Sequence, residues 1–201
     1  MFCIYKYNFN YYMSNQIYTK PKSKVFHVIP WDSNKNIGDS YNETMMNVGS
    51  QDWVCFLDGD AVHTTPFFGK HIEDVIRDNP EYDLLTCYTN RIGFTPQIAP
   101  GVNKDTNDQK YHRDFGSNMW DKHGTEVMDV TNMRFISGVL LLIRKDTWER
   151  VGGFKTTNML GVDNDIHLRV MTYGGKVGLM KGIYVQHWYR GGNNKDTKHL
   201  L

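Results

Sequence analysis

The chain has 201 residues, 40% of them apolar, and a formal net charge of +1, which suits one domain of ordinary size with a substantial core. A charge so close to zero argues against a protein built to bind nucleic acid or an anionic membrane surface. The longest apolar run, near 139–143, is far too short to cross a bilayer, so no transmembrane segment is expected.

The cysteines and the first residues indicate a cytoplasmic protein. Cys3, Cys55 and Cys87 are odd in number, and no CxxC motif occurs. Cys55 and Cys87 lie within apolar runs, so they are expected to be buried free thiols in a reducing compartment. The first fifteen residues lack the basic start and apolar centre of a signal peptide.

The first half of the chain alternates between strand-like and helix-like patterns. Residues 1–24 are rich in tyrosine and asparagine and form an extension, so that the predicted domain covers 25–201. Strands are expected at 25–29, 53–57 and 83–88, and helices at 39–48 and 66–78. This order predicts an α/β fold whose central sheet is mostly parallel and flanked by helices.

The second half begins with an irregular region. Residues 90–133 show little apolar periodicity, and so long a loop region in a compact domain is usually functional. Later elements are expected in this order: strand 135–143, helix 145–151, helix 163–173, and strands 176–180 and 183–186.

The most informative motif is Trp53-Val-Cys-Phe-Leu-Asp58-Gly-Asp60, in which a buried strand ends in two aspartates. In open α/β sheets, ligands bind in the crevice beyond the carboxyl ends of the strands. Adjacent carboxylates repel each other unless a cation lies between them, and oxygen ligands suit Mg²⁺ or Mn²⁺. The alternative is that Asp-Gly is a common turn dipeptide and that acids at strand ends aid solubility.

Three blocks of the sequence together resemble the GT-A fold of nucleotide-sugar glycosyltransferases, and most closely the family 2 type. The first block joins residues 36–42 to the DxD motif of 56–60. The second contains the small-residue strand 137–143 and the Gly-Gly-Phe turn that ends at Phe154. The third contains 161–169, Gly174-Gly175 and 185–187, and it also resembles the catalytic block of the polypeptide N-acetylgalactosaminyltransferases. The blocks span most of 25–190.

The chain departs from that family at two points. Position 162 is Val where the family usually has Glu. The family's first strand-helix-strand unit, which binds uracil, is missing, because 25–29 leads directly into the loop before Asn36. The nucleotide-binding half is therefore pared down.

The resemblance implies a metal site and a general base. Asp58, Asp60 and His187 are the expected ligands of Mn²⁺ or Mg²⁺, with His63 as the nearest rival histidine. Asp163, at the expected start of the 163–173 helix, is the candidate base, because a helix N-terminus favours the ionised carboxylate. Asp165 is the second candidate, although it lies four residues before Arg169 and suits a surface ion pair.

Further residues are expected to line the same crevice. Trp31 could stack on a base or a sugar or simply pack in the core, and the helix after Gly38 could present its N-terminus to phosphate. The predicted donor-binding set is Pro30, Trp31, Asp32, Asn36, Gly38, Asn42, Gly59 and Arg190. Acceptor or sugar contacts are assigned to Ser137, Gly138 and Trp188, and Arg190, Lys195 and Lys198 are expected to close over the phosphates unless they form a plain solvated terminus.

The sequence thus predicts a metal-dependent glycosyltransferase that moves a sugar from a nucleoside-diphosphate sugar, most simply UDP-linked, to the hydroxyl of a glycan or another acceptor. Assigning Asp163 as base implies inversion at the anomeric carbon. Two alternatives stay open: a nucleotidyltransferase of related fold, and a degenerate, non-catalytic glycan-binding domain.

Overall fold

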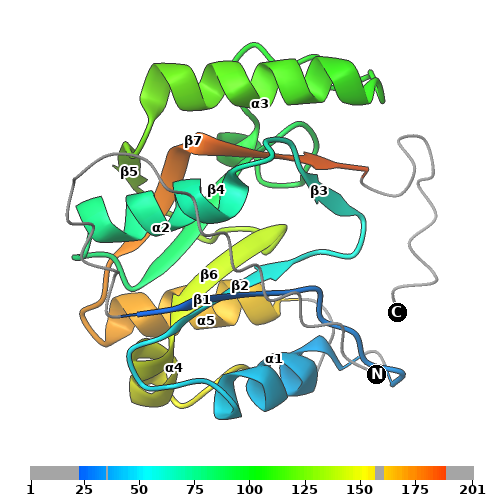
Figure 1. Cartoon of the computed structure of the whole chain (residues 1–201). Coiled ribbons are helices and arrows are strands. Elements are labelled where there is room, and N and C mark those ends of the chain that lie inside the picture. Colours follow the sequence, from blue (N-terminus) through cyan, green and yellow to red (C-terminus); the bar gives the residue numbers. More distant parts are fainter. Residues whose placement is uncertain (1–22, 35, 157–160, 189–201) are drawn as a thin grey trace.

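A seven-stranded sheet with helices on both faces forms the core of the protein (Figure 1). The computed structural model describes residues 23–34, 36–156 and 161–188. The strands are β1 (Val25–Val28), β2 (Trp53–Leu57), β3 (Ala61–His63), β4 (Leu84–Thr89), β5 (Val127–Asp129), β6 (Leu140–Arg144) and β7 (Val177–His187). The helices are α1 (Ile37–Met46), α2 (Phe68–Asp78), α3 (Gln109–His123), α4 (Lys145–Val151) and α5 (Val162–Thr172), with a short 3₁₀ turn at Thr95–Gln97.

The α/β class is confirmed, but the expectation of a mostly parallel sheet is wrong. The strand order is β1-β2-β6-β4-β7-β3, with β5 pairing with β7 off this path. Among the described strands, the pairs β1·β2 and β4·β7 are parallel and the other four pairs are antiparallel. Because β6 is inserted antiparallel between β2 and β4, the strands β1, β2, β4 and β7 still all run in one direction.

The helices divide between the two faces of the sheet (Figure 1). Tyr41 and Met45 of α1 and Ile166 of α5 pack with Phe56 of β2 in one buried cluster. Ile72 of α2 packs in the other cluster, with Cys55 of β2 and with residues of β4 and β6. Side chains alternate between the two faces along β2, so Cys55 and Phe56 point to opposite sides of the sheet.

The expectation of an irregular region at 90–133 is wrong over α3, which packs along β7. Asp108 caps this helix by accepting a hydrogen bond from the backbone N–H of Lys110 at 2.8 Å. The buried positions His112, Gly116 and Met119 follow helical spacing. Two of these three residues are not strongly apolar, so the apolar pattern of this helix is weak.

Other expectations on the elements need smaller corrections. The strands expected at 176–180 and 183–186 are one strand, β7, whose pairing with β4 shifts register between Cys87 and Tyr88. Only the second half of the expected strand 135–143 lies in β6, and β3 and β5 were not expected.

Cys55 and Cys87 are buried free thiols, as expected, whereas Cys3 and nearly all of the predicted extension lie outside the described residues. None of the described helices has the length and apolar character that a membrane span requires.

Candidate functional site

Polar residues from several strands meet at one edge of the sheet. Because β2, β4 and β7 run in the same direction, the residues that follow or end them lie at the same edge: Asp58 after β2, Asn90 after β4, and His187 at the end of β7. The antiparallel strands β3 and β6 begin at this edge, which adds Asp60 and Gly138. The sheet topology therefore brings together residues that are distant in the chain, such as Asp60 and His187, which are 127 residues apart.

Asp58, Asp60 and His187 lie close enough together to share one cation. One ligand atom from each residue lies within 4.8 Å of the others. Nε2 of His187 is 3.1 Å from Oδ1 of Asp60. The backbone N–H of Trp188 donates to the carbonyl of Asp60 at 2.9 Å, which holds the Asp60 turn against the end of β7. His63, the rival histidine, lies elsewhere, beside His27 and Phe68.

The imidazole of His187 is held in one orientation by its neighbours. Nδ1 lies 2.8 Å from the carbonyl oxygen of Arg91, which can only accept, so Nδ1 carries a proton and donates it. The backbone N–H of His187 donates to Oδ1 of Asn90 at 2.7 Å. This support directs Nε2 toward Asp60, in the way that metal-binding histidines are commonly oriented.

Burial and neighbouring charges shift the pKa values of the cluster. Burial raises the pKa of Asp58 to about 7; the nearby His187 opposes this shift, and the charges of Asp60 and Asp163 add to it. Burial lowers the pKa of His187, but its hydrogen bond to Asp60, the charges of Asp60 and Asp58 and its hydrogen bond to the carbonyl of Arg91 together outweigh burial and raise this pKa overall. Two carboxylates and one oriented imidazole nitrogen fit Mn²⁺ or Mg²⁺, so the donor set is chemically suited to the expected ion.

Asp163 lies in the first turn of α5 and near this cluster, since its charge raises the pKa of Asp58. The backbone N–H of Gly138 donates to Oδ2 of Asp163 at 2.8 Å, and that of Asn164 donates to Oδ1 at 2.8 Å. Burial raises the pKa of Asp163, and these backbone hydrogen bonds oppose the shift. The N-cap of α5 is Gly161 rather than Asp163.

Asp165 is engaged in the ion pair that its spacing suggested. Nε of Arg169 donates to Oδ2 of Asp165 at 2.9 Å, and Nη1 of Arg169 donates to the carbonyl of Val151 at 2.6 Å. The pair thus links α5 to the end of α4. This geometry favours Asp163 over Asp165 as the reactive carboxylate.

Among the predicted donor-binding residues, Asp32 and Asn42 already make several internal hydrogen bonds. Oδ1 of Asp32 accepts from the backbone N–H groups of Asn34 (2.7 Å) and Asn36 (2.9 Å), which shapes the loop before α1. The amide of Asn42 donates to the carbonyl of Phe154 (2.9 Å) and accepts from its N–H (2.7 Å). It also accepts from Nε1 of Trp148 at 2.9 Å, so Asn42 ties α1 to the Gly-Gly-Phe turn.

The remaining donor-binding candidates differ in exposure. Trp31 is 71% exposed and therefore does not pack in the core. Gly59 is exposed and Pro30 is buried. Gly38 is buried, and a Cβ added there would lie 1.9 Å from the carbonyl oxygen of Lys155, so close packing accounts for this glycine. Asn36 precedes α1, and its amide donates to Asp39.

The residues predicted to contact the acceptor or the sugar lie in two segments: Ser137 and Gly138 precede β6, and Trp188 follows β7. Ser137 is held by Gln97: its N–H donates to Oε1 at 2.6 Å, and its carbonyl accepts from Nε2 at 3.0 Å. The carbonyl of Trp188 accepts from the guanidinium of Arg91 at 3.2 Å. Gly138 contacts Asp163 directly, and a Cβ at Gly138 would lie 3.2 Å from that of Asp163.

Four residues near the site were missed as functional candidates: Tyr41, Asn90, Arg91 and Gln97. Asn90 and Arg91 follow β4 in the same way that Asp58 follows β2, and that position after a strand was the available signal. Burial raises the pKa of Tyr41, and the charges of Asp58 and Asp163 raise it further, which places its hydroxyl near both acids. Arg190, Lys195 and Lys198 lie outside the described residues.

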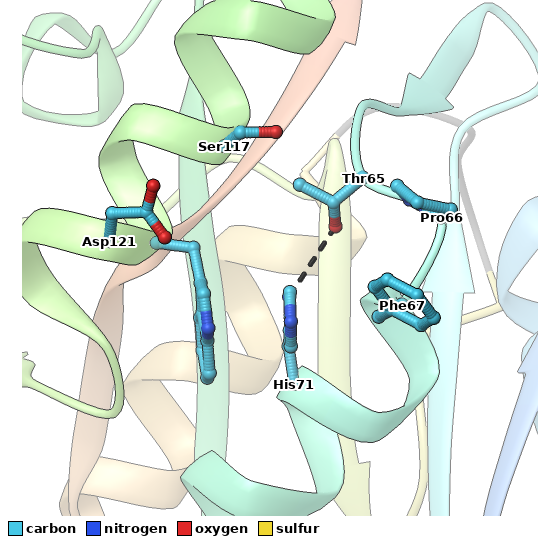
Figure 2. A pocket seen from close by; sticks show the side chains of 7 residues that line it. Thr65, Pro66, Phe67, His71, Ser117 and Asp121 are labelled. Carbon is cyan, nitrogen blue, oxygen red and sulfur yellow. Dashed lines mark hydrogen bonds between the residues drawn. The ribbon is translucent and has the colours of Figure 1, made fainter.

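Two surface hollows are lined by other residues. The one in Figure 2 lies between α2 and α3, and there Thr65 points toward His71, with Oγ1 3.4 Å from Nδ1. The ring of His71 stacks on that of Trp120, with centroids 3.7 Å apart. Because these ring faces already contact each other, they are not free to stack on a sugar. The second hollow is lined by Asn42, Trp148 and the glycines of the Gly-Gly-Phe turn.

No protein-family model matches the chain, and comparison with curated proteins also finds no match.

Proposed function

We propose that this protein is a metal-dependent glycosyltransferase of GT-A type that uses a nucleoside-diphosphate sugar. The observation that carries the proposal is the convergence of Asp58, Asp60 and His187, with the imidazole of His187 oriented by the carbonyl of Arg91. The sequence motifs that resemble family 2 enzymes supply the reaction class.

Asp58, Asp60 and His187 would hold Mn²⁺ or Mg²⁺. The ion, when bound, would stabilise the negative charge that develops on the leaving diphosphate. Arg91 and Asn90 position His187 through its ring nitrogen and its backbone N–H. Burial raises the pKa of Asp58 and the neighbouring charge of Asp60 adds to the shift; a cation beside these carboxylates would favour their ionised forms.

Asp163 is the proposed general base, which would take the proton from the acceptor hydroxyl. Its raised pKa increases its affinity for that proton, while the two backbone N–H donors hold the carboxylate in place. A base that deprotonates an acceptor opposite the leaving group implies inversion at the anomeric carbon. Trp31 is exposed enough to stack on the base of the nucleotide, which we propose is uracil.

The test is a release assay across nucleotide sugars, with Mn²⁺ and then with EDTA, that measures free nucleoside diphosphate. We expect release from at least one UDP-sugar, its loss in EDTA, and its loss in Asp60→Asn. Asp114→Asn is the matched control, because it removes the same charge from an exposed residue of α3. Metal-independent binding of glycans with no release would instead favour a non-catalytic glycan-binding domain, and pyrophosphate-dependent turnover would favour a nucleotidyltransferase.

A further inference from the structure

A second group of metal-binding side chains lies on the opposite face of β2 from the Tyr41 cluster. His27 of β1 and Cys55 of β2 are register partners in the parallel pair, so their side chains lie next to each other on one face. His63, the last residue of β3, completes the group. One ligand atom from each residue lies within 4.8 Å of the other two, and the two imidazole rings meet edge to face with centroids 5.9 Å apart.

One nitrogen of this group lacks a hydrogen bond. Nδ1 of His27 is buried, and no polar atom in the described ranges pairs with it. Buried polar side-chain atoms usually have partners, and leaving one without a partner costs about 1–3 kcal/mol. A bound cation would provide the missing partner.

Burial keeps both imidazoles in the form that binds metals. It lowers the pKa of His27 to about 4, and burial together with the charge of His27 lowers that of His63 to about 3. Both rings are therefore neutral near pH 7. Burial also raises the pKa of the Cys55 thiol to about 12, so this thiol stays protonated until a cation displaces the proton.

The surroundings of the group orient its rings. The ring of Phe68, at the start of α2, stacks on His63 with centroids 3.8 Å apart and an interplanar angle of 5°. The same ring meets His27 edge to face at 5.2 Å. Cys55 is fully buried, whereas His63 is partly exposed.

We propose that His27, Cys55 and His63 form a second metal site, which binds Zn²⁺ or a cation of the same borderline-soft class. Two imidazoles and a thiolate suit such ions, whereas the carboxylates of Asp58 and Asp60 suit harder ones. Zn–N and Zn–S bonds are about 2.0–2.3 Å long, so an ion between ligand atoms that lie within 4.8 Å of one another would draw them closer together. On binding, the Cys55 S–H bond breaks, a metal–sulfur bond forms, and the proton goes to the buffer.

The site would act as a structural clamp. Cys55 and His63 lie on either side of the turn that contains Asp58, Gly59 and Asp60, so a cation bound to both would fix the base of that turn. His27 would connect this site to β1, which is an outermost strand of the sheet and pairs only with β2 among the described strands. The two sites are distinct, because the group of His27, Cys55 and His63 shares no residue with the group of Asp58, Asp60 and His187.

Cobalt provides the test, because a Co²⁺–thiolate bond gives a charge-transfer band that a site of carboxylates and imidazole lacks. Chelator-treated full-length Cys3→Ser protein is titrated with Co²⁺ and then with Zn²⁺. We expect the band to appear, to be removed by Zn²⁺, and to persist in Asp60→Asn, which removes a ligand of the other site only. In Cys55→Ser it should disappear, while Cys87→Ser, the matched change of a buried thiol on β4, should keep it.

If Cys55→Ser does not fold, as judged by circular dichroism, His63→Gln replaces it. His63 is partly exposed, and loss of this ligand should lower the Co²⁺ affinity at least about tenfold while the fold persists. Absence of the band in the Cys3→Ser protein, its survival in Cys55→Ser, or unchanged affinity in His63→Gln would each overturn the proposal. None of these readouts depends on transferase activity, so the second site fails or stands independently of the proposed function.

Discussion

The backbone N–H of Gly138 donates a hydrogen bond to Oδ2 of Asp163 at 2.8 Å, while Oδ1 of the same carboxylate accepts from Asn164. This pair of contacts joins the segment before β6 to the first turn of α5 at the edge of the sheet where Asp58 lies. Both oxygens of Asp163 act as acceptors, which determines how the candidate base can be tested.

Asp163→Asn should reduce sugar transfer by about 10²-fold or more, the scale on which a general base contributes, and should leave donor binding nearly unchanged. It should also lower stability, because the Asn amide nitrogen would face a backbone N–H and leave a buried donor unpaired, at a cost of about 1–3 kcal/mol. Initial rates should therefore be measured at a temperature where circular dichroism shows the variant to be folded.

The control for this substitution is Asp165→Asn, which removes the same charge two residues away. It breaks the ion pair with Arg169, which is partly exposed and contributes about 0–1 kcal/mol, and transfer should persist. If Asp165→Asn abolishes transfer while Asp163→Asn does not, the two roles are reversed.

The metal site makes a separate prediction. Asp60→Asn should weaken Mn²⁺ binding by at least about tenfold, as measured by calorimetry on the full-length chain, because the amide no longer provides an anionic ligand beside Nε2 of His187. Asn90→Ala should weaken Mn²⁺ binding less, since Asn90 accepts a hydrogen bond from the backbone N–H of His187 and does not hold its ring. Equal Mn²⁺ affinity in the wild type and in Asp60→Asn would rule out Asp60 as a ligand.

The sequence predicted that Asp58 and Asp60 lie in the crevice beyond the carboxyl ends of the strands, because an apolar strand ends at Asp58. The choice of His187 among the histidines came from the family resemblance, and the structure brings the three residues together. The sequence was insufficient for strand direction, since nothing in the apolar run of β6 indicates that it is antiparallel to β2. Helix α3 was missed because Gly116 occupies a buried position. A Cβ there would lie 2.1 Å from Oγ1 of Thr64, so tertiary packing rather than hydropathy explains this residue.

Stability should depend on pH through Asp83. Its Oδ1 accepts hydrogen bonds from Arg144, Thr147 and Arg150 at 2.8–2.9 Å, and its Oδ2 accepts from the backbone N–H of Lys176 at 3.0 Å. Burial opposes ionisation, but the hydrogen bonds from Arg150, Lys176 and Thr147 outweigh it and lower the pKa of Asp83.

A lowered folded-state pKa means that this stabilisation is complete above the unfolded-state value, about 3.9, and is lost as the pH falls through the folded-state value. Asp83→Asn should therefore lower the free energy of unfolding by about 2 kcal/mol or more at pH 7, a figure below that for fully buried pairs because both arginines are partly exposed. Urea titrations at pH 7 and pH 3 should show the difference between variant and wild type shrinking at pH 3. A constant difference would contradict the assignment.

Gly38 distinguishes packing from donor binding. A Cβ there would lie 1.9 Å from the carbonyl oxygen of Lys155 and 2.9 Å from its carbonyl carbon, and backbone atoms cannot move aside as the end of a side chain can. Asn42 holds α1 to Phe154 of the same segment, so the helix cannot shift freely. Gly38→Ala should therefore destabilise the protein by about 1–3 kcal/mol, the usual scale for overpacking.

The matched control is Gly93→Ala, where an added Cβ meets nothing within 4 Å and the free energy of unfolding should stay within about 0.5 kcal/mol of the wild-type value. Thermal unfolding of both variants, with and without UDP and Mn²⁺, separates the two roles of Gly38. If packing is its role, Gly38→Ala lowers the melting temperature and UDP still raises it by the wild-type increment. A variant that melts like the wild type but no longer responds to UDP would instead show that the start of α1 contacts the donor.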